Sequence, residues 1–163
     1  MATVEVTFTP LPVHVRTARL VATAVARRSG VAESLLDEVR LAVGEACSRA
    51  VEAHQRHCPW EPIRVSLTDD GEQFQVVVTD AVQGPEHDLP AGVSLSAGAG
   101  AIGGNGAALE VDFEVPPGGA VPLRLPEDVG LAVIAGLADD VRIAPAGDGT
   151  SVTMIWKRRA AAY

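Results

Sequence analysis

Two charged side chains in the string "EACSRAVEAH", residues 45–54, have a spacing that could serve chemistry. Glu45 and Arg49 are four residues apart, so on a helix they share one edge and can form an ion pair. A guanidinium can instead bind a phosphate through its fork of donors. Two hypotheses are therefore open: a surface ion pair worth about 0.3–0.5 kcal/mol, or part of a nucleotide site.

Two other strings look reactive but lack the partners that their chemistry needs. His54, His57 and Cys58 in "HQRHC" could ligate a metal, but no further ligands follow at finger spacing, so we expect an ordinary loop. The string "GAGAIGGNG" is not followed by the Lys-Ser or Lys-Thr pair of a Walker loop. The two cysteines, Cys47 and Cys58, do not make a disulfide framework.

Hydrophobic periodicity predicts the elements that must position these residues. Alternating apolar residues predict strands at 3–8, 141–144 and 152–156, and a hairpin over 63–80 that turns at "DDG". Helical spacing predicts one helix over 14–28, a second from residue 33 or 34 to the prolines of "HCPWEP", and a third after residue 129. The predicted apolar stripe of the first helix consists of Val15, Leu20, Val21, Ala24 and Val25.

The segment at about 85–128 differs in composition from the rest of the chain. It is rich in Gly, Ala and Pro, and between Asp88 and Glu127 its only basic residue is Arg124. This composition predicts a long loop or lid, with one short strand at "LEVDFEV", residues 109–115. We expect the loop to belong to a single domain over 1–163, where a loop of this length is often functional.

Length and charge exclude several classes of protein. The 163 residues suffice for one domain with a sizeable core. The net charge is −8 and the only basic string is "KRR" at 157–159, so direct nucleic-acid binding is not expected. The first residues lack the features of a signal peptide, and no run of 18 apolar residues could span a membrane. We therefore expect a cytoplasmic protein.

The order of the predicted elements is β–α–α–β–β–loop–α–β–β. It predicts an α+β fold, a two-layer α/β sandwich whose mixed, mostly antiparallel sheet carries the helices on one face. With an acidic helix ahead of a hairpin ending in "VVVTD", the chain resembles the GHKL ATP-binding domain (the Bergerat fold), and in particular the bacterial anti-sigma factors of the serine-protein-kinase type. That resemblance covers nearly the whole chain.

The resemblance implies a function and a set of partners. Such a protein binds a sigma factor and keeps it from RNA polymerase, and it binds ATP with Mg²⁺. It phosphorylates a serine or threonine of a small anti-anti-sigma factor of the STAS fold. Members of the family often form homodimers, so a homodimer is also implied.

The helix motif of that family, roughly Glu-Ala-x-Thr-Asn-Ala, matches "EACSRA" only in part. The resemblance implies that Glu45 is the catalytic general base, and Ser48 replaces the threonine. Arg49 stands where the family has the asparagine that holds Mg²⁺. Because arginine has donors and no acceptor, it cannot ligate a cation. We expect Arg49 to pair with Glu45 or to reach a nucleotide phosphate directly, and the metal site to be lost.

The motif Asp-x-Gly-x-Gly, whose aspartate accepts a hydrogen bond from the adenine amino group, reads "DAVQG" here. Asp80 and Gly84 match as nucleotide-binding residues. Val82 replaces the first glycine, which is used for a tight turn and close ligand approach. The aspartate at the strand end stays usable as an acceptor.

Two further nucleotide motifs lie near the end of the chain. The family's Gly-x-Gly-Leu motif opens a helix whose N-terminus meets phosphate. Here Gly130 and Leu131 match, while Asp128 at the first glycine would repel phosphate. The Gly-Thr pair on the penultimate strand is intact at Gly149 and Thr150.

Arginines in the first predicted helix are candidates for partner contacts. In the family, a first-helix arginine contacts both the sigma factor and the STAS partner. Ungapped counting from Glu45 gives Arg19 for that position, and Arg16 lies one turn earlier on the same face. The alternative is a pair of solvated arginines at the start of a helix.

Three functions are compatible with these residues. The first is a binding module, an anti-sigma-type regulator whose ATP binding is weakened or lost. The second is an active ATP-dependent serine/threonine kinase in which Glu45 activates the acceptor hydroxyl. The third is a GHKL-like domain that only sequesters an anti-anti-sigma factor. The missing metal ligand favours the first.

Overall fold

The computed structural model describes residues 1–82, 93–96, 125–147 and 149–158. Its strands are β1 (Ala2–Phe8), β2 (Ile63–Asp69), β3 (Gln73–Thr79), β4 (Val93–Ser96), β5 (Asp140–Ala146) and β6 (Gly149–Lys157). Its helices are α1 (Pro12–Arg28), the short 3₁₀ helix η1 (Glu33–Leu35), α2 (Leu36–His57) and α3 (Leu125–Leu137). The strands form one sheet in the order β1–β2–β3–β6–β5–β4.

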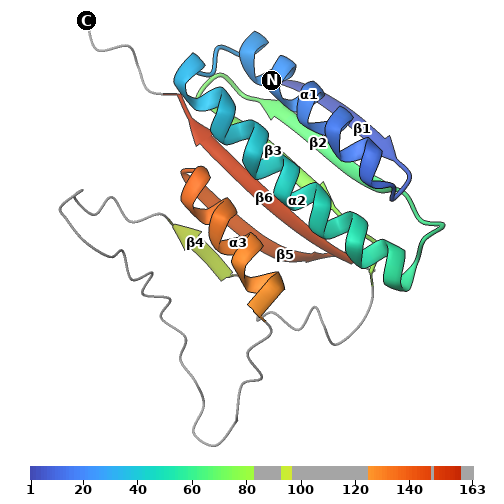
Figure 1. Cartoon of the computed structure of the whole chain (residues 1–163). Coiled ribbons are helices and arrows are strands. Elements are labelled where there is room, and N and C mark those ends of the chain that lie inside the picture. Colours follow the sequence, from blue (N-terminus) through green and yellow to red (C-terminus); the bar gives the residue numbers. More distant parts are fainter. Residues whose placement is uncertain (83–92, 97–124, 148, 159–163) are drawn as a thin grey trace, which may run out of the picture.

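Helices α1, α2 and α3 lie together over one face of this sheet (Figure 1). The predicted two-layer α+β fold is confirmed. One detail differs, because each neighbouring pair of the described strands is antiparallel and the sheet is therefore not mixed. A hairpin connection can join antiparallel neighbours directly, as it does for β2 and β3.

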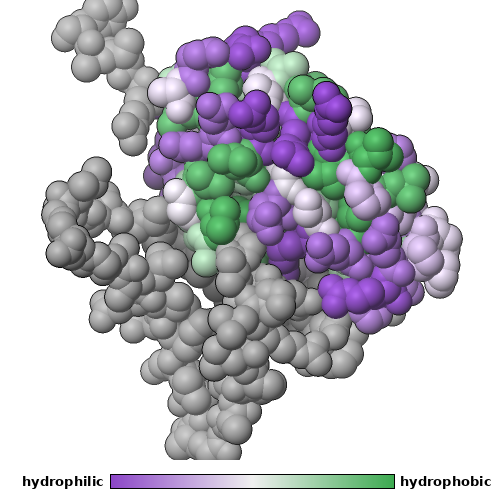
Figure 2. Space-filling model, in the orientation of Figure 1, coloured by the Kyte–Doolittle hydropathy of each residue, from purple (hydrophilic) through white to green (hydrophobic). Residues whose placement is uncertain are grey.

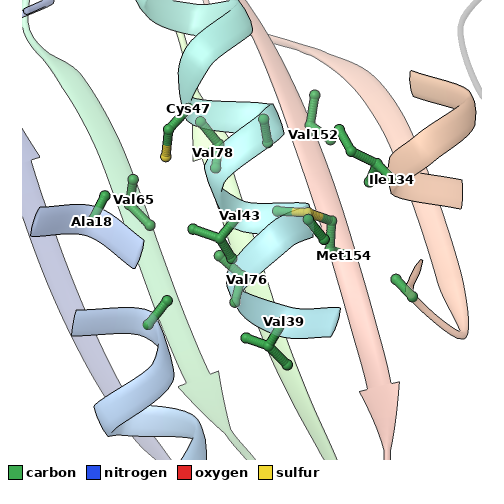
Figure 3. Close-up of a cluster of buried hydrophobic side chains, with 14 of the residues drawn as sticks. Ala18, Val39, Val43, Cys47, Val65, Val76, Val78, Ile134, Val152 and Met154 are labelled. Carbon is green, nitrogen blue, oxygen red and sulfur yellow. The ribbon is translucent and has the colours of Figure 1, made fainter. Parts of the chain in front are cut away.

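The strand register explains why one face of the sheet is apolar. Val65 lies opposite Val78, and Val76 lies opposite Met154, so apolar side chains line up across β2, β3 and β6. They are buried beneath the helices, where α2 contributes side chains to the same cluster (Figure 3). The alternate positions, such as Thr68 opposite Gln75, carry polar side chains to the other face.

The β2–β3 hairpin turns at "DDG", as the sequence predicts. The Asp70 carboxylate accepts hydrogen bonds from the backbone N–H groups of Glu72 at 2.9 Å and Gln73 at 2.8 Å. These bonds, that from Gln73 most strongly, lower the pKa of Asp70, because they stabilise its charged form. Gly71 has a φ of 94°, in the left-handed region that glycine adopts without strain.

Helix α2 is the central helix and packs between α1 and α3 (Figure 1). Its buried side chains recur at helical spacing, as expected for a helix that covers a sheet, and they include Leu36, Val39, Val43, Ala46 and Ala50. The sequence also placed a helix start at residue 33 or 34, where η1 precedes α2.

The predicted stripe of α1 is wrong in part. Leu20 is 59% exposed and Ala24 is exposed, although helical spacing assigned both to the core. The helix instead buries three alanines, Ala18, Ala22 and Ala26. Small side chains allow close packing of α1 against its neighbours, and hydropathy alone ranks them below leucine.

The predicted loop at about 85–128 needs two corrections. Residues 93–96 form β4, which pairs with β5 at the edge of the sheet. Helix α3 begins at Leu125, so Gly130 lies inside the helix and not at its first turn. The sequence around that start, with proline at residue 126 and acidic residues at 127 and 128, is typical of a helix N-terminus. The strand predicted at 109–115 lies outside the described residues.

Candidate functional site

The end of β3 and the start of β6 bring together two of the predicted nucleotide-binding residues, 70 positions apart. The carboxylate of Asp80 accepts hydrogen bonds from the backbone N–H of Thr150 at 3.2 Å and from that of Val82 at 3.0 Å. The N–H of Asp80 in turn donates to the carbonyl of Thr150 at 2.9 Å. Both bonds to the carboxylate reach the same oxygen, Oδ1, so its orientation is fixed by backbone groups.

Gly149 allows this close approach of the two strand ends. A Cβ atom at this position would lie 1.8 Å from the carbonyl oxygen of Asp80 and 2.8 Å from the Cα of Ala81. No side chain fits at such distances, so the Gly-Thr string is needed for the contact between β3 and β6 itself. The packing of the two strand ends therefore requires glycine at position 149, independently of any ligand.

His54 of helix α2 contacts the backbone next to Asp80. Its side chain is fully buried, and Nδ1 lies 2.9 Å from the carbonyl oxygen of Glu61. The backbone N–H of Ala81 donates to Nε2 at 3.0 Å. His54 lies on the predicted helix, and the ordinary loop expected for "HQRHC" is wrong, because α2 continues to His57. No group of three or more His, Cys, Asp or Glu that could hold a metal ion occurs among the described residues.

Glu45 and Arg49 both lie on α2 and are partly buried. No ion pair joins them in the described part of the chain, so the favoured helical spacing does not produce the expected contact. The Nε atom of Arg49 is buried and has no hydrogen-bond partner there. A buried donor without a partner is unfavourable by about 1–3 kcal/mol, so a phosphate or carboxylate that reached Arg49 would relieve this cost.

Arg49, at the position of the family's metal ligand, does not suit Mg²⁺. The ion requires oxygen ligands in near-octahedral geometry. Arg49 offers only N–H donors and a positive charge, which repels a cation. Asp80, by contrast, presents a carboxylate held in place by Val82 and Thr150, which suits recognition of an amino group. The Asp80 carboxylate therefore has the chemistry to accept from an adenine amino group, whereas Arg49 lacks the chemistry to ligate Mg²⁺.

Arg19 of α1 lies across α2. A Cβ atom on Gly44 would come within 2.7 Å of the Cδ atom of Arg19, so the glycine makes room for the arginine stem. The Nε atom of Arg19 is buried without a hydrogen-bond partner among the described residues. Cys47 is nearby: burial raises the pKa of its thiol to about 12, and the positive charge of Arg19 opposes the shift. Arg16, one turn earlier, is exposed.

The remaining predicted site residues are not brought together with Asp80 and Thr150 by any described hydrogen bond, apart from Val82. Leu131 is buried and belongs to the core cluster, and Gly130 lies within α3. Val82, which replaces a glycine of the family motif, is buried as well. Gly84 lies outside the described residues. Sequence reasoning considered His54 only as a metal ligand and did not consider Gly44. No local pattern predicts their contacts, because these are with residues distant in the chain.

An antiparallel sheet with three helices on one face is the α+β architecture of GHKL-type domains. The sequence model of the histidine kinase-like ATPase domain family matches residues 8–156, and the chain belongs to this family. No curated protein matches the chain significantly. Each described helix is too short or too polar to cross a membrane.

Proposed function

We propose that the protein is a cytoplasmic anti-sigma-type regulator that binds a sigma factor, a STAS-domain anti-anti-sigma factor, or both. In this proposal it acts through protein contacts. Its nucleotide site is weakened at the place where the family holds Mg²⁺ and this chain has Arg49. The observation that carries the proposal is Arg49, a cation with a buried, unpartnered Nε in the described structure, at the position of the family's metal ligand.

The charge of helix α1 supports a protein partner. The chain has a net charge of −8, yet α1 contains four arginines and no acidic residue. Arg27 is paired with Glu33 at 3.0 Å, while Arg16 and Arg28 are exposed. Exposed arginines attract an acidic partner surface. Arg16 is exposed on this helix, and Arg19 lies at its contact with α2.

Exposed apolar side chains lie beside these arginines. Val13 and Leu20 on α1 and Leu41 on α2 are 67%, 59% and 52% exposed. Figure 2 shows hydrophobic (green) and hydrophilic (purple) residues next to one another on the helix-covered side of the molecule. Apolar residues interspersed with arginine are common at the centres of protein interfaces.

A second candidate function is an active serine/threonine kinase that phosphorylates the STAS partner. The presence of both Asp80 and Thr150, which the family resemblance assigns to nucleotide binding, supports it, and the bond from the Thr150 N–H holds the Asp80 carboxylate in place. In this reading Glu45 would be the general base for the acceptor hydroxyl. Arg49 would have to neutralise phosphate charge in place of the metal.

Co-purification tests the proposal. The tagged chain, expressed in its host, should retain a sigma factor or a STAS-domain protein, identified by mass spectrometry with and without ATP. Arg16→Glu should abolish this capture, whereas Arg64→Glu, an equal charge change at an exposed position of β2, should not. Capture of neither class of protein by the wild-type chain would refute the proposal.

Nucleotide titration separates the two candidates. Calorimetry with ATP should give weak binding that does not depend on Mg²⁺, and Arg49→Asn should introduce Mg²⁺ dependence by supplying an oxygen ligand. Tight Mg²⁺-dependent binding by the wild-type chain would contradict a weakened metal end. Transfer of labelled phosphate to a co-purified STAS protein would establish the kinase reading.

A further inference from the structure

His54 connects three parts of the chain next to Asp80. It is located on α2, and its two ring nitrogens contact the carbonyl of Glu61 and the N–H of Ala81. Because a backbone N–H can only donate, Nε2 must carry a lone pair, and the proton of the neutral ring is on Nδ1. The ring is fully buried, and both of its polar atoms are used.

The bond to Ala81 acts on the peptide that joins Asp80 to Ala81. That peptide's N–H donates to Nε2 of His54 at 3.0 Å, which fixes the plane of the peptide. The N–H of Asp80 is held on its other side by the carbonyl of Thr150 at 2.9 Å. With both flanking peptides fixed, the carboxylate of Asp80 can direct Oδ1 to Val82 and Thr150 in one orientation.

We infer that His54 is a positioning residue for Asp80: its neutral ring holds the Ala81 peptide and so orients the carboxylate toward an incoming adenine base. The inference rests on the proposed function in one respect, namely that the Asp80–Thr150 site receives the base of a nucleotide. A purely structural histidine would tie the chain at Glu61 to α2, and the bond from Nδ1 alone would suffice for that. The second bond reaches the backbone next to Asp80 and goes beyond this need.

Two amide variants separate the two bonds. In His54→Asn the side-chain amide can donate from the place of Nδ1 to Glu61, but nothing remains at the place of Nε2. In His54→Gln the amide oxygen can occupy the place of Nε2 and accept from Ala81. The probes are adenosine, titrated into the full chain by calorimetry, and amide hydrogen exchange of Ala81 and Thr150 followed by NMR.

We expect His54→Asn to weaken adenosine binding about tenfold, the effect of losing one buried hydrogen bond, and to accelerate exchange at Ala81 and Thr150. His54→Gln should stay within about twofold of the wild type, since its acceptor is restored. The same loss in both variants, or no change in either, would overturn the inference. So would an absence of measurable adenosine binding to the wild-type chain.

One measurement does not depend on the folding of any variant. In the ¹⁵N-labelled wild-type protein, a scalar coupling across the hydrogen bond should connect the Ala81 amide nitrogen to Nε2 of His54. A ring protonated at Nε2 would give no such coupling and would overturn the inference. Adenosine titration and co-purification of protein partners are separate readouts, so failure of this inference and failure of the proposed function can be told apart.

Discussion

Replacement of Gly149 by alanine should destabilise the protein by about 3 kcal/mol. The new Cβ would lie 1.8 Å from the carbonyl oxygen of Asp80, whereas real Cβ atoms essentially never come closer than 3.0 Å. The end of β3 must therefore move by at least 1.2 Å relative to β6, the difference between these two distances. The atom to be displaced belongs to the backbone, so no side-chain rotation can relieve the clash.

The magnitude follows from what this movement breaks. Two hydrogen bonds join Asp80 to Thr150, at 2.9 Å and 3.2 Å, and a shift above 1 Å exceeds their tolerance. Each contributes about 1 kcal/mol net, and overpacking costs at least about 1 kcal/mol more, so about 3 kcal/mol is the lower end of the expected loss. For a chain of this size, about 3 kcal/mol lowers Tm by about 6–12 °C.

Thermal and urea unfolding, followed by circular dichroism, measure this effect. Gly136→Ala is the matched control, because a Cβ at Gly136 in α3 meets nothing within 4 Å. That variant should leave the protein unchanged or stabilise it by up to about 1 kcal/mol, the helix propensity of alanine over glycine. A Gly149→Ala variant within about 1 kcal/mol of the wild type would refute the reasoning, since it would show that the strand ends are not in close contact.

Three further predictions concern individual side chains. The Asp70 carboxylate has a lowered pKa, so its contribution to stability is present above its unfolded-state pKa near 4 and is lost as pH falls through the lower folded value. Asp70→Asn should therefore be less stable than the wild type at neutral pH, with a difference that shrinks in urea melts below about pH 4; a constant difference down to pH 2 would contradict the assignment. Burial raises the pKa of Cys47 to about 12, so its thiol should not react with a thiol reagent at pH 8 until urea unfolds the chain. Rapid labelling of the native protein would contradict this burial and show that α1 and α2 separate in the folded state. Trp156→Phe should lower the unfolding free energy by about 1–3 kcal/mol, because the indole N–H donates to the carbonyl of Leu137 at 2.9 Å; an unchanged melt would mean that water replaces this bond.

Local patterns predicted the sheet far better than they predicted the site. The alternation in "IRVSLTD" and "QFQVVVT" assigns each residue to a face, because neighbours on a strand point to opposite sides. The turn between them follows from Asp70 and Gly71, which supply the capping carboxylate and the positive φ. Such features depend on residues close in the chain, so they can be read without knowledge of the fold.

The errors fall where distant contacts decide the outcome. Strand β4 lies in a segment whose composition predicts a loop, and it exists through its pairing with β5, more than 40 residues later. In α1, the choice between Leu20 and Ala22 for the core depends on the space left by its neighbours, and hydropathy favours the exposed one. The family resemblance alone assigned Asp80 and Thr150 to a nucleotide site, and no pattern predicted their contact with each other or the hydrogen bond from Ala81 to His54.

The two ends of the candidate site differ in what their residues reveal about ligand binding. Asp80, Gly149 and Thr150 hold the ends of β3 and β6 together, so the fold itself requires them whether or not a nucleotide binds. Arg49 has no such structural use in the described chain, and its buried Nε lacks a partner at a cost to stability. A residue that the fold does not need, and that is unfavourable without a partner, carries more information about function than three that the fold needs. The departure from the family pattern at Arg49 therefore carries more weight than the agreement at Asp80. The titration of Arg49→Asn with and without Mg²⁺ is the sharper test of whether this site has lost its metal-dependent nucleotide binding.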